Sequence, residues 1–302
     1  MASPPQATSA VVATSRVRQV LADYVDLTKP KVQSLLLLTT VTTMLVAGEP
    51  SLWLIVATCI GGYLSAGGAG AVNHYYDRDI DAKMPRTANR PVPSGRVSPV
   101  AALTFGCLLA AASIVWLSVL VNPLAAALSF SGFAGYVGVY TIWLKRRSVQ
   151  NIVIGGAAGA VPPLVGWAAV TGSVSGLAVL LFAIVFFWTP AHFWALSLLM
   201  KDEYASVNVP MLPVVRGEAE TRRQILLYAI LTYMVSQLPF SGGTFGVIYL
   251  VVSLALGIAL IGYAVRLWRH PSRKAALSLY LFSLLYLALL FAAMVVDVKV
   301  LG

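Results

Sequence analysis

Charged residues are scarce in this sequence of 302 residues, where they make up 11% of the chain, against about a quarter in a typical soluble domain. Hydrophobic residues make up 59%. Apolar stretches of about 20 residues, the length that crosses a bilayer, recur along almost the whole chain and leave no segment that could form a separate soluble domain. The composition excludes a soluble protein and predicts one all-α integral membrane domain.

Cysteine is also scarce, and the signatures of several enzyme classes are missing. Cys59 and Cys107 are the only cysteines, and each lies inside an apolar run without the spacing of a metal site, so both are expected to be core residues. The chain has no Walker-type glycine loop and no HExxH motif. Nucleotide hydrolysis and zinc-dependent proteolysis therefore have no support in the sequence.

Apolar runs separated by glycine, proline and charge predict nine transmembrane helices. They lie near 33–48, 52–74, 99–121, 124–143, 150–171, 174–199, 223–240, 244–265 and 275–297. The start of the chain lacks the continuous apolar core of a secretory signal. We therefore expect a flexible tail over 1–23 and a membrane domain over 24–302.

The basic residues predict the orientation of these helices. Of the 21 lysines and arginines, twenty lie in the N-terminal tail or after the second, fourth, sixth and eighth spans, and only Lys299 lies on the other side. The positive-inside rule places the N-terminus and those loops in the cytoplasm, or in the matrix of an organelle. The formal net charge of +10 is thus a topology signal and does not indicate nucleic-acid binding.

The acidic residues gather on the same predicted cytoplasmic side. Seven of the eleven follow the second and sixth spans, namely Asp77, Asp79, Asp81, Asp202, Glu203, Glu218 and Glu220. A weak internal repeat accompanies them, because tyrosine and basic residues follow the fourth and eighth spans. Two four-helix halves and a ninth helix would place the two acidic loops across a common cavity, where we expect a cationic ligand.

The row of Asn73, Asp77 and Asp81 is the strongest chemical signal, because its members recur every four residues and share one face if the second span continues through them. Stacked carboxylates at a helix C-terminus cost about 0.3–1 kcal/mol each, a penalty that a bound cation removes. Asp79 points elsewhere and is expected to be structural. The alternative is a solvated acidic helix end.

Magnesium suits this row, since Mg²⁺ prefers oxygen ligands and is commonly held by one or two carboxylates together with substrate phosphates. The complementary charge comes from Lys83, Arg86 and Arg90 in the following loop and from Lys145 after the fourth span. Arginine forks can bind phosphate oxygens that the metal does not reach, and Arg86 and Arg90 are the preferred clamps. The alternative for each is an ordinary positive-inside residue.

The string NHYYDRDIDAKMPRTANRPVPSGR resembles the NxxxDxxxD signature of the UbiA-type intramembrane prenyltransferases, in the form found in haem O synthases. Three further strings, LTKPKV, YTIWLKRRSVQNIVIGGAAGAVPPLVGW and WTPAHFWALSLLMKDEYASVNVPMLPVVRG, are similar to the same branch. The resemblance covers roughly residues 24–297 and implies a helical bundle around a central cavity.

The resemblance also implies the chemistry of the site. Asn73, Asp77 and Asp81 would hold magnesium and farnesyl diphosphate, Asp202 would begin a second acidic site, and the acceptor would be a vinyl group of haem B, which is a substrate and not a cofactor. A bacterial plasma membrane is favoured over the mitochondrial inner membrane, and the product could pass to a haem A synthase. Composition and spacing do not reveal the acceptor.

The second acidic site departs from the common DxxxD pattern, because Ser206 stands four residues after Asp202. We expect Asp202 to act in catalysis and to bind metal. Glu203 is its neighbour and cannot share the same helical face, so one of the two would bind metal while the other orients Lys201, Tyr204 or an arginine. Lys201, Glu203 and Tyr204 are predicted to contact the substrates.

His192 lies inside the sixth predicted span, where an ionisable side chain is costly and indicates function. A contact with haem is one interpretation, and a core histidine that satisfies a backbone carbonyl freed by Pro190 is the other. The glycines of the second and fifth spans present a similar choice between close helix packing and a slot for a planar macrocycle.

Two other functions remain open from the residues. A prenyltransferase that acts on an aromatic quinone precursor would share the aspartate row. A transporter would place its polar residues near the middle of the membrane and interrupt helices in both halves, whereas here the acids gather at one face.

Overall fold

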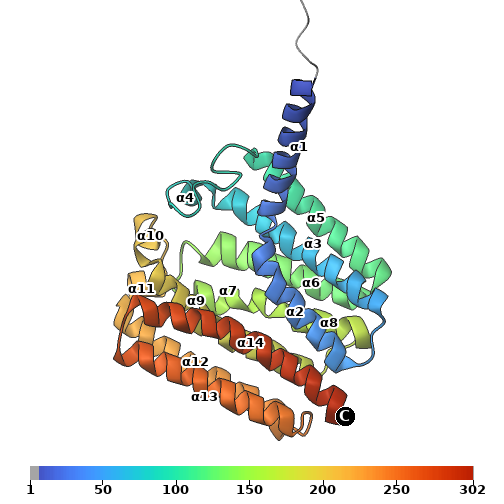
Figure 1. Cartoon of the computed structure of the whole chain (residues 1–302), viewed down its shortest axis with the longest axis vertical. Helices are drawn as coiled ribbons and strands as arrows, with labels where there is room; N and C mark the ends of the chain where they lie inside the picture. Colours follow the sequence, from blue (N-terminus) through green and yellow to red (C-terminus); the bar gives the residue numbers. More distant parts are fainter. Residues whose placement is uncertain (1–6, 302) are drawn as a thin grey trace, which may run out of the picture.

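The computed structural model describes residues 7–301, and within that range every regular element is a helix (Figure 1). The helices are α1 (Ala7–Leu27), α2 (Pro30–Ala47), α3 (Leu52–Tyr76), α4 (Arg78–Asp81), α5 (Pro99–Leu120), α6 (Pro123–Ala134), η1 (Gly135–Leu144), α7 (Asn151–Gly159), α8 (Val161–Thr171), α9 (Gly176–Leu199), α10 (Lys201–Ser206), α11 (Leu212–Val215), α12 (Gly217–Ser241), α13 (Val247–Arg269) and α14 (Arg273–Leu301).

The prediction of an all-α membrane bundle is confirmed, and the count of nine spans is approximate. Eight segments of the described chain are long and apolar enough to cross a membrane. The predicted span that is not among these eight is the seventh, over 223–240, which corresponds to α12; this helix is 25 residues long but begins with the polar turns around Glu218 and Glu220. It packs between α9 and α13 as a member of the bundle.

Two of the predicted spans are composite. The fourth consists of α6 and η1, and η1 is a π-helix whose wide turns include a bond from the Lys145 amide to the Tyr140 carbonyl at 2.8 Å. The fifth consists of α7 and α8, which meet at Ala160, and prolines stand in the first turn of α8. Wide π-turns shift the register of the side chains that follow and are frequent at functional sites.

The predicted tail contains helix α1, which runs from Ala7 to Leu27 and continues past the expected boundary at residue 23. Residues 1–6 lie outside the described residues. The division into a tail over 1–23 and a domain over 24–302 stays a prediction.

Glycines of α3 allow close helix packing, as one of the two sequence interpretations expected. A Cβ atom added at Gly68 would lie 2.7 Å from the carbonyl oxygen of Gly106 on α5, and one added at Gly61 would lie 2.4 Å from the side chain of Leu117. Such distances are far inside van der Waals contact. At Gly68 and Gly106 the two helices therefore cross where neither backbone carries a side chain.

We expect Gly68→Val to lower the stability of the folded protein, because the new side chain must push α3 away from α5. Overpacking of this kind costs about 1–3 kcal/mol or more. The matched control is Gly62→Val on the same helix, where the nearest atom, Leu37 Cδ2, lies 3.9 Å from an added Cβ. Thermal unfolding in detergent should show a clear drop for the first variant only, and equal midpoints would contradict the close crossing.

A second pair of glycines on α3 lets the junction between α1 and α2 pack closely against this helix. A Cβ at Gly70 would lie 3.0 Å from the Leu27 carbonyl oxygen, and one at Gly67 would lie 3.1 Å from Thr28 Cβ. Lys29 follows directly with φ 54° and ψ 57°, a left-handed conformation that is uncommon for a residue with a side chain. The glycines thus let the junction press against α3 and place Lys29 beside its last turns.

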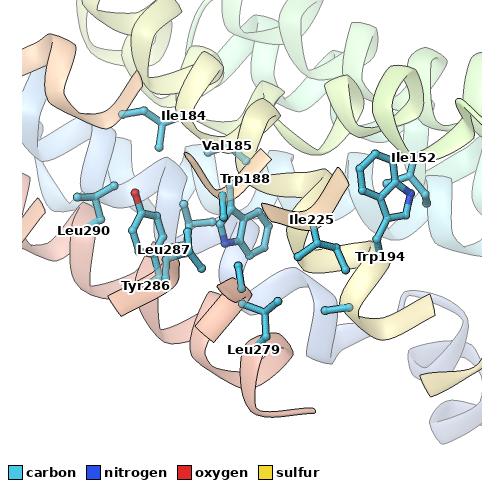
Figure 2. Close-up of a cluster of buried hydrophobic side chains, with 14 of the residues drawn as sticks. Ile152, Ile184, Val185, Trp188, Trp194, Ile225, Leu279, Tyr286, Leu287 and Leu290 are labelled. Atoms are coloured by element: carbon cyan, nitrogen blue, oxygen red, sulfur yellow. The ribbon is translucent and has the colours of Figure 1, made fainter. Parts of the chain in front are cut away.

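The largest hydrophobic core joins α9, α12, α13 and α14. Figure 2 shows part of it, where Trp188 of α9 lies among Leu279, Leu287 and Ile225. The indole nitrogen of Trp188 donates to the Ser283 carbonyl at 2.8 Å. This contact fixes α9 against α14 and holds the segment that carries His192.

Candidate functional site

The row of Asn73, Asp77 and Asp81 is buried as a unit. Their exposed fractions are 2%, 1% and 3%. α3 ends at Tyr76 and α4 begins at Arg78, but the Asp77 amide still bonds the Asn73 carbonyl and the Asp81 amide bonds the Asp77 carbonyl. The helical rise is therefore nearly continuous and keeps the three side chains on one face, as the spacing predicts.

Three cations from three separate segments face this row, one for each member. Lys29 Nζ lies 2.5 Å from Asn73 Oδ1, the ammonium of Lys145 pairs with Asp77, and Arg90 Nη1 lies 2.7 Å from Asp81 Oδ2. Removing charges from water costs several kcal/mol for each ion unless they are paired. The alternation of cations and oxygen ligands makes this row a polar centre rather than a solvated helix end.

The row is also bonded internally. The Asn73 amide group donates to Asp77 Oδ2 at 2.7 Å and to Thr141 Oγ1 at 3.1 Å. Thr141 belongs to η1, and Lys145 follows directly after it. The π-helix thus supplies both a hydroxyl and an ammonium to the carboxylate row, and this fixes the orientation of Asn73 with its oxygen toward Lys29.

Asp79 behaves as predicted and points away from the row. Its side chain is 57% exposed and forms a bidentate pair with Arg146 at 2.6 and 2.7 Å. That pairing lowers the pKa of Asp79 to about 2. Arg146 also approaches Asp77 Oδ1 at 3.7 Å, so it adds positive charge at the outer edge of the site.

Burial and neighbouring charges both act on the Lys29 ammonium. Burial lowers the pKa of its ammonium to about 7, and the neighbouring cations Arg90 and Lys145 act in the same direction, while Asp77 and Asp81 oppose them. An anion placed among these cations would favour the charged form of each. The cluster therefore has unused capacity for a polyanionic ligand.

The residues present fit a magnesium ion held jointly by protein and ligand. Asp77 Oδ1 is buried and has no hydrogen-bond partner among the described residues, and the amide oxygen and carboxylates offer the hard oxygen ligands that Mg²⁺ prefers. No group of three or more His, Cys, Asp or Glu residues in the described chain forms a metal cage by itself. That agrees with an ion that takes the rest of its ligands from phosphate and water.

The second acidic segment lies on α10, at the same end of the bundle as α4 (Figure 1). Burial raises the pKa of the Tyr204 hydroxyl, and the nearby cations Lys145, Arg86 and Arg90 oppose that shift. Tyr204 therefore lies within reach of the charges around the aspartate row. The cavity predicted between the two acidic segments stays a prediction.

The two acids of α10 differ in environment. Asp202 is exposed, whereas Glu203 is half-buried and its Oε2 atom has no hydrogen-bond partner among the described residues. The assignment of Asp202 to metal stays a prediction. The unpaired oxygen of Glu203 makes that residue an equal candidate for a cation.

Three of the residues predicted to contact the substrates do not contact the aspartate row. Lys83 and Arg86 are exposed, although Arg86 lies near Tyr204. Lys201 turns to the surface, where its Nζ lies 3.1 Å from Glu218 Oε1. Among the predicted cations, Arg90 and Lys145 are those that contact the carboxylates directly.

His192 is buried in α9 next to α14. Its Nδ1 lies 2.7 Å from Ser283 Oγ, and its ring stacks on Trp188 and Tyr280 with centroids 4.4 and 4.8 Å away. The expected bond to a carbonyl freed by Pro190 is replaced by this hydroxyl. The contact with haem stays a prediction.

Lys29 is the main residue of the site that sequence reasoning missed. It lies in the LTKPKV string, where it reads as one more positive-inside residue. The only local signal is that Pro30 follows it, because proline disfavours the right-handed helical region for the residue before it. Thr141, Arg146 and Ser283 were also missed, since each meets its partner across a long sequence separation.

Comparison with known proteins agrees with this geometry. The model of the UbiA prenyltransferase family matches residues 36–293. The protoheme IX farnesyltransferase of Chloroflexus aurantiacus is 55% identical over 298 residues, which cover 98% of this chain and 51% of that protein. The one from Deinococcus radiodurans is 53% identical over 294 residues, which cover 93% and 94%. The chain spans about half the length of the first curated relatives that it matches.

Two solved structures share the fold at low sequence identity. Digeranylgeranylglyceryl phosphate synthase superposes with a TM-score of 0.77 at 18% identity and covers 92% of this chain and 98% of its own. A UbiA homolog from Archaeoglobus fulgidus, bound to GPP and Mg²⁺, superposes with a TM-score of 0.65 at 16% identity and covers 90% and 99%. With a family match over most of its length, a shared fold and a buried NxxxDxxxD row, the chain belongs to the UbiA prenyltransferase family.

Proposed function

We propose that this protein transfers the farnesyl group of farnesyl diphosphate to a vinyl group of haem B and so makes haem O. The buried row of Asn73, Asp77 and Asp81 with its three cations carries the diphosphate half of the proposal. The acceptor half is supported by relatives that are 52–55% identical and are named protoheme IX farnesyltransferases.

The diphosphate would bind where the cations now neutralise the carboxylates. Lys29, Lys145 and Arg90 would turn from the row to the phosphate oxygens, and Arg146 would close the outer edge. When bound, magnesium supplies charge neutralisation between the carboxylates and the diphosphate. In the absence of diphosphate, Asp77 and Asp81 keep Lys145 and Arg90 at the site through the contacts of this structure.

The reaction would begin with heterolysis of the allylic C–O bond, whose electron pair leaves with the diphosphate. Lys29 and Lys145 would stabilise the charge that grows on the leaving oxygen, where preorganised electrostatics have their largest effect. The vinyl carbon of haem B would attack the farnesyl cation and form the C–C bond. Water would add to the resulting porphyrin-stabilised cation and release a proton, which completes a hydroxyethylfarnesyl group.

A purified-enzyme assay tests the acceptor. Protein in detergent is incubated with farnesyl diphosphate, magnesium and either haem B or 4-hydroxybenzoate, and products are identified by mass spectrometry. Haem O from the first mixture and no prenylated product from the second are expected. The reverse result would favour the aromatic quinone precursor, the alternative that shares the aspartate row.

The orientation of the chain is part of the same proposal. The N-terminus and the loops that carry α4 and α10 would lie in the cytoplasm of a bacterium, with the C-terminus outside. Lys299 near the end of α14 pairs with Glu49 in the loop between α2 and α3, which places both at the opposite end from α4 and α10 (Figure 1). Haem O would leave within the bilayer and pass to a haem A synthase.

Cysteine labelling measures this topology. In a background that lacks Cys59 and Cys107, we expect Ser94→Cys, Ser148→Cys and Ser272→Cys to react only from the cytoplasmic side, because all three follow even-numbered spans. Gly302→Cys should react only from outside, and residue 302 lies outside the described residues. Labelling of any of the first three from outside would show that the helix count or the orientation is wrong.

A further inference from the structure

We propose that Ser283 is a positioning residue that fixes the tautomer of His192 and leaves Nε2 free to bind the iron of the acceptor porphyrin. The inference rests on the proposed function and adds the way in which the acceptor is held. The Ser283 hydroxyl forms the hydrogen bonds that carry it. Ser283 is completely buried on α14, and His192 lies opposite it on α9.

The Ser283 hydroxyl has a single proton, and the Tyr280 carbonyl accepts it. Ser283 Oγ donates to the Tyr280 carbonyl at 2.7 Å, a bond within its own helix. The same oxygen lies 2.7 Å from His192 Nδ1, and since it has no second proton to give, it accepts there. The imidazole must therefore carry its proton on Nδ1 and a lone pair on Nε2.

Nε2 makes no hydrogen bond with the residues that the structure describes, in contrast to Nδ1. A half-turn of the ring about its Cβ–Cγ bond would bring a carbon atom to Ser283 Oγ in place of Nδ1 and so lose that hydrogen bond. Trp188 and Tyr280 lie nearly parallel to the ring at interplanar angles of 16° and 25°. Two rings stacked this closely cannot share one face of an imidazole, so each covers one face, and Phe193 packs at 85° to the imidazole with its centroid 5.4 Å away.

Ser283 also holds the stack together. Its carbonyl accepts from the Trp188 indole at 2.8 Å, and its hydroxyl bonds the carbonyl of Tyr280. Ser283 thus contacts the ring on one face through the Trp188 indole, which its carbonyl holds, and the Nδ1 edge of the imidazole through its hydroxyl. A neutral imidazole whose second nitrogen donates to a fixed acceptor is the usual form of a histidine that ligates a metal.

A porphyrin iron is the metal that suits this site. Histidine is a common axial ligand of haem, and an iron approaching Nε2 would place the macrocycle perpendicular to the imidazole plane. The edges of Trp188 and Tyr280 would then meet the face of the porphyrin, an arrangement that aromatic rings favour. Among the described residues, His192 belongs to no group of three or more His, Cys, Asp or Glu residues that could hold a bare metal ion.

The test compares Ser283→Ala with wild type and with Ser236→Ala, using haem B in detergent-purified protein. Ser236 is an equally buried hydroxyl that bonds Tyr286 on α14 but lies away from His192, so it controls for loss of a buried hydrogen bond. Resonance Raman spectroscopy of the ferrous complex reports the iron–histidine stretch, and titration reports haem affinity. Wild type must first make haem O, because failure there overturns the proposed function and this inference with it.

For protein that makes haem O, His192→Gly should lose the iron–histidine band, and added imidazole should restore it. Ser283→Ala should keep the band at lower frequency and weaken haem binding by about 10-fold to 100-fold, the usual effect of removing a partner that orients a ligand. Ser236→Ala should leave both unchanged. An unaltered band in well-folded His192→Gly would overturn ligation, and an unaltered band and affinity in Ser283→Ala would overturn the positioning role.

Discussion

Asp77→Asn should abolish farnesyl transfer while the protein still inserts and purifies. The change keeps the size of the side chain and its capacity to accept from Asn73 and Lys145, but it removes the charge that pairs with the Lys145 ammonium and that a magnesium ion would need. Loss of one preorganised electrostatic partner lowers turnover by about 10²–10³-fold. Because the Asp77 carboxylate would also bind the metal, we expect turnover to fall by about 10³-fold, the upper end of this range. A steady-state assay with saturating magnesium measures this loss.

Asp79→Asn is the matched control, because Asp79 lies two residues further along the chain, on α4, and the change removes the same charge. Its carboxylate is exposed and pairs with Arg146, and exposed ion pairs contribute about 0–1 kcal/mol. Because this contribution is small, we expect the turnover of Asp79→Asn to stay within about threefold of wild type. Near-normal turnover of Asp77→Asn, or an equal loss of turnover in both variants, would show that the Asp77 carboxylate does not bind the diphosphate through magnesium. Thermal unfolding of each variant separates lost chemistry from lost fold.

The aspartate row could be predicted from the sequence because its signal is local. A spacing of four residues puts Asn73, Asp77 and Asp81 on one helical face, and the acids gather at one end of the apolar spans, on the side that the basic residues predict to be cytoplasmic. The structure keeps that face almost continuous across the end of α3. The exposure of Asp79 follows from the same geometry, as the sequence predicted.

The cations of the site could be predicted only in part, because their partners are distant in sequence. Arg90 lies nine residues from Asp81, and a short loop returns it to the row. Lys145 reaches Asp77 across 68 residues through the register of a π-helix, which the hydropathy pattern does not reveal. Lys83 and Lys201 were predicted by the same reasoning of charge and proximity, and they lie on the surface instead.

The choice between the two acids of α10 could not be made from spacing. Ser206 stands where a second aspartate would complete the pattern, so helical periodicity favours neither Asp202 nor Glu203. The structure gives them different surroundings, with Asp202 in solvent and one Glu203 oxygen buried without a partner. Burial of an unpaired oxygen costs about 1–3 kcal/mol, a penalty that a bound cation would remove.

Lys29→Met is expected to have the second largest effect on catalysis. Methionine keeps the unbranched stem in the left-handed backbone position of Lys29, so the strain of the junction is unchanged and only the ammonium is lost. That ammonium lies 2.5 Å from Asn73 Oδ1. It is one of the three positive charges available to a diphosphate. We expect kcat/KM for farnesyl diphosphate to fall by about 10²-fold, in line with removal of one charge that stabilises a leaving group.

Lys31→Met supplies the matched control for this loss of charge. Lys31 lies two residues further on in the first turn of α2, is exposed, and forms no ion pair with the described residues. A general effect of positive charge at this membrane surface would lower the activity of both variants alike, whereas a specific contact predicts damage from Lys29→Met alone. Lys29→Arg should recover part of the activity, because it restores the charge but not the compact geometry of an ammonium. If Lys29→Met turns over farnesyl diphosphate at the wild-type rate, the diphosphate is held by Lys145 and Arg90 without the junction, and the left-handed conformation of Lys29 serves only the turn into α2.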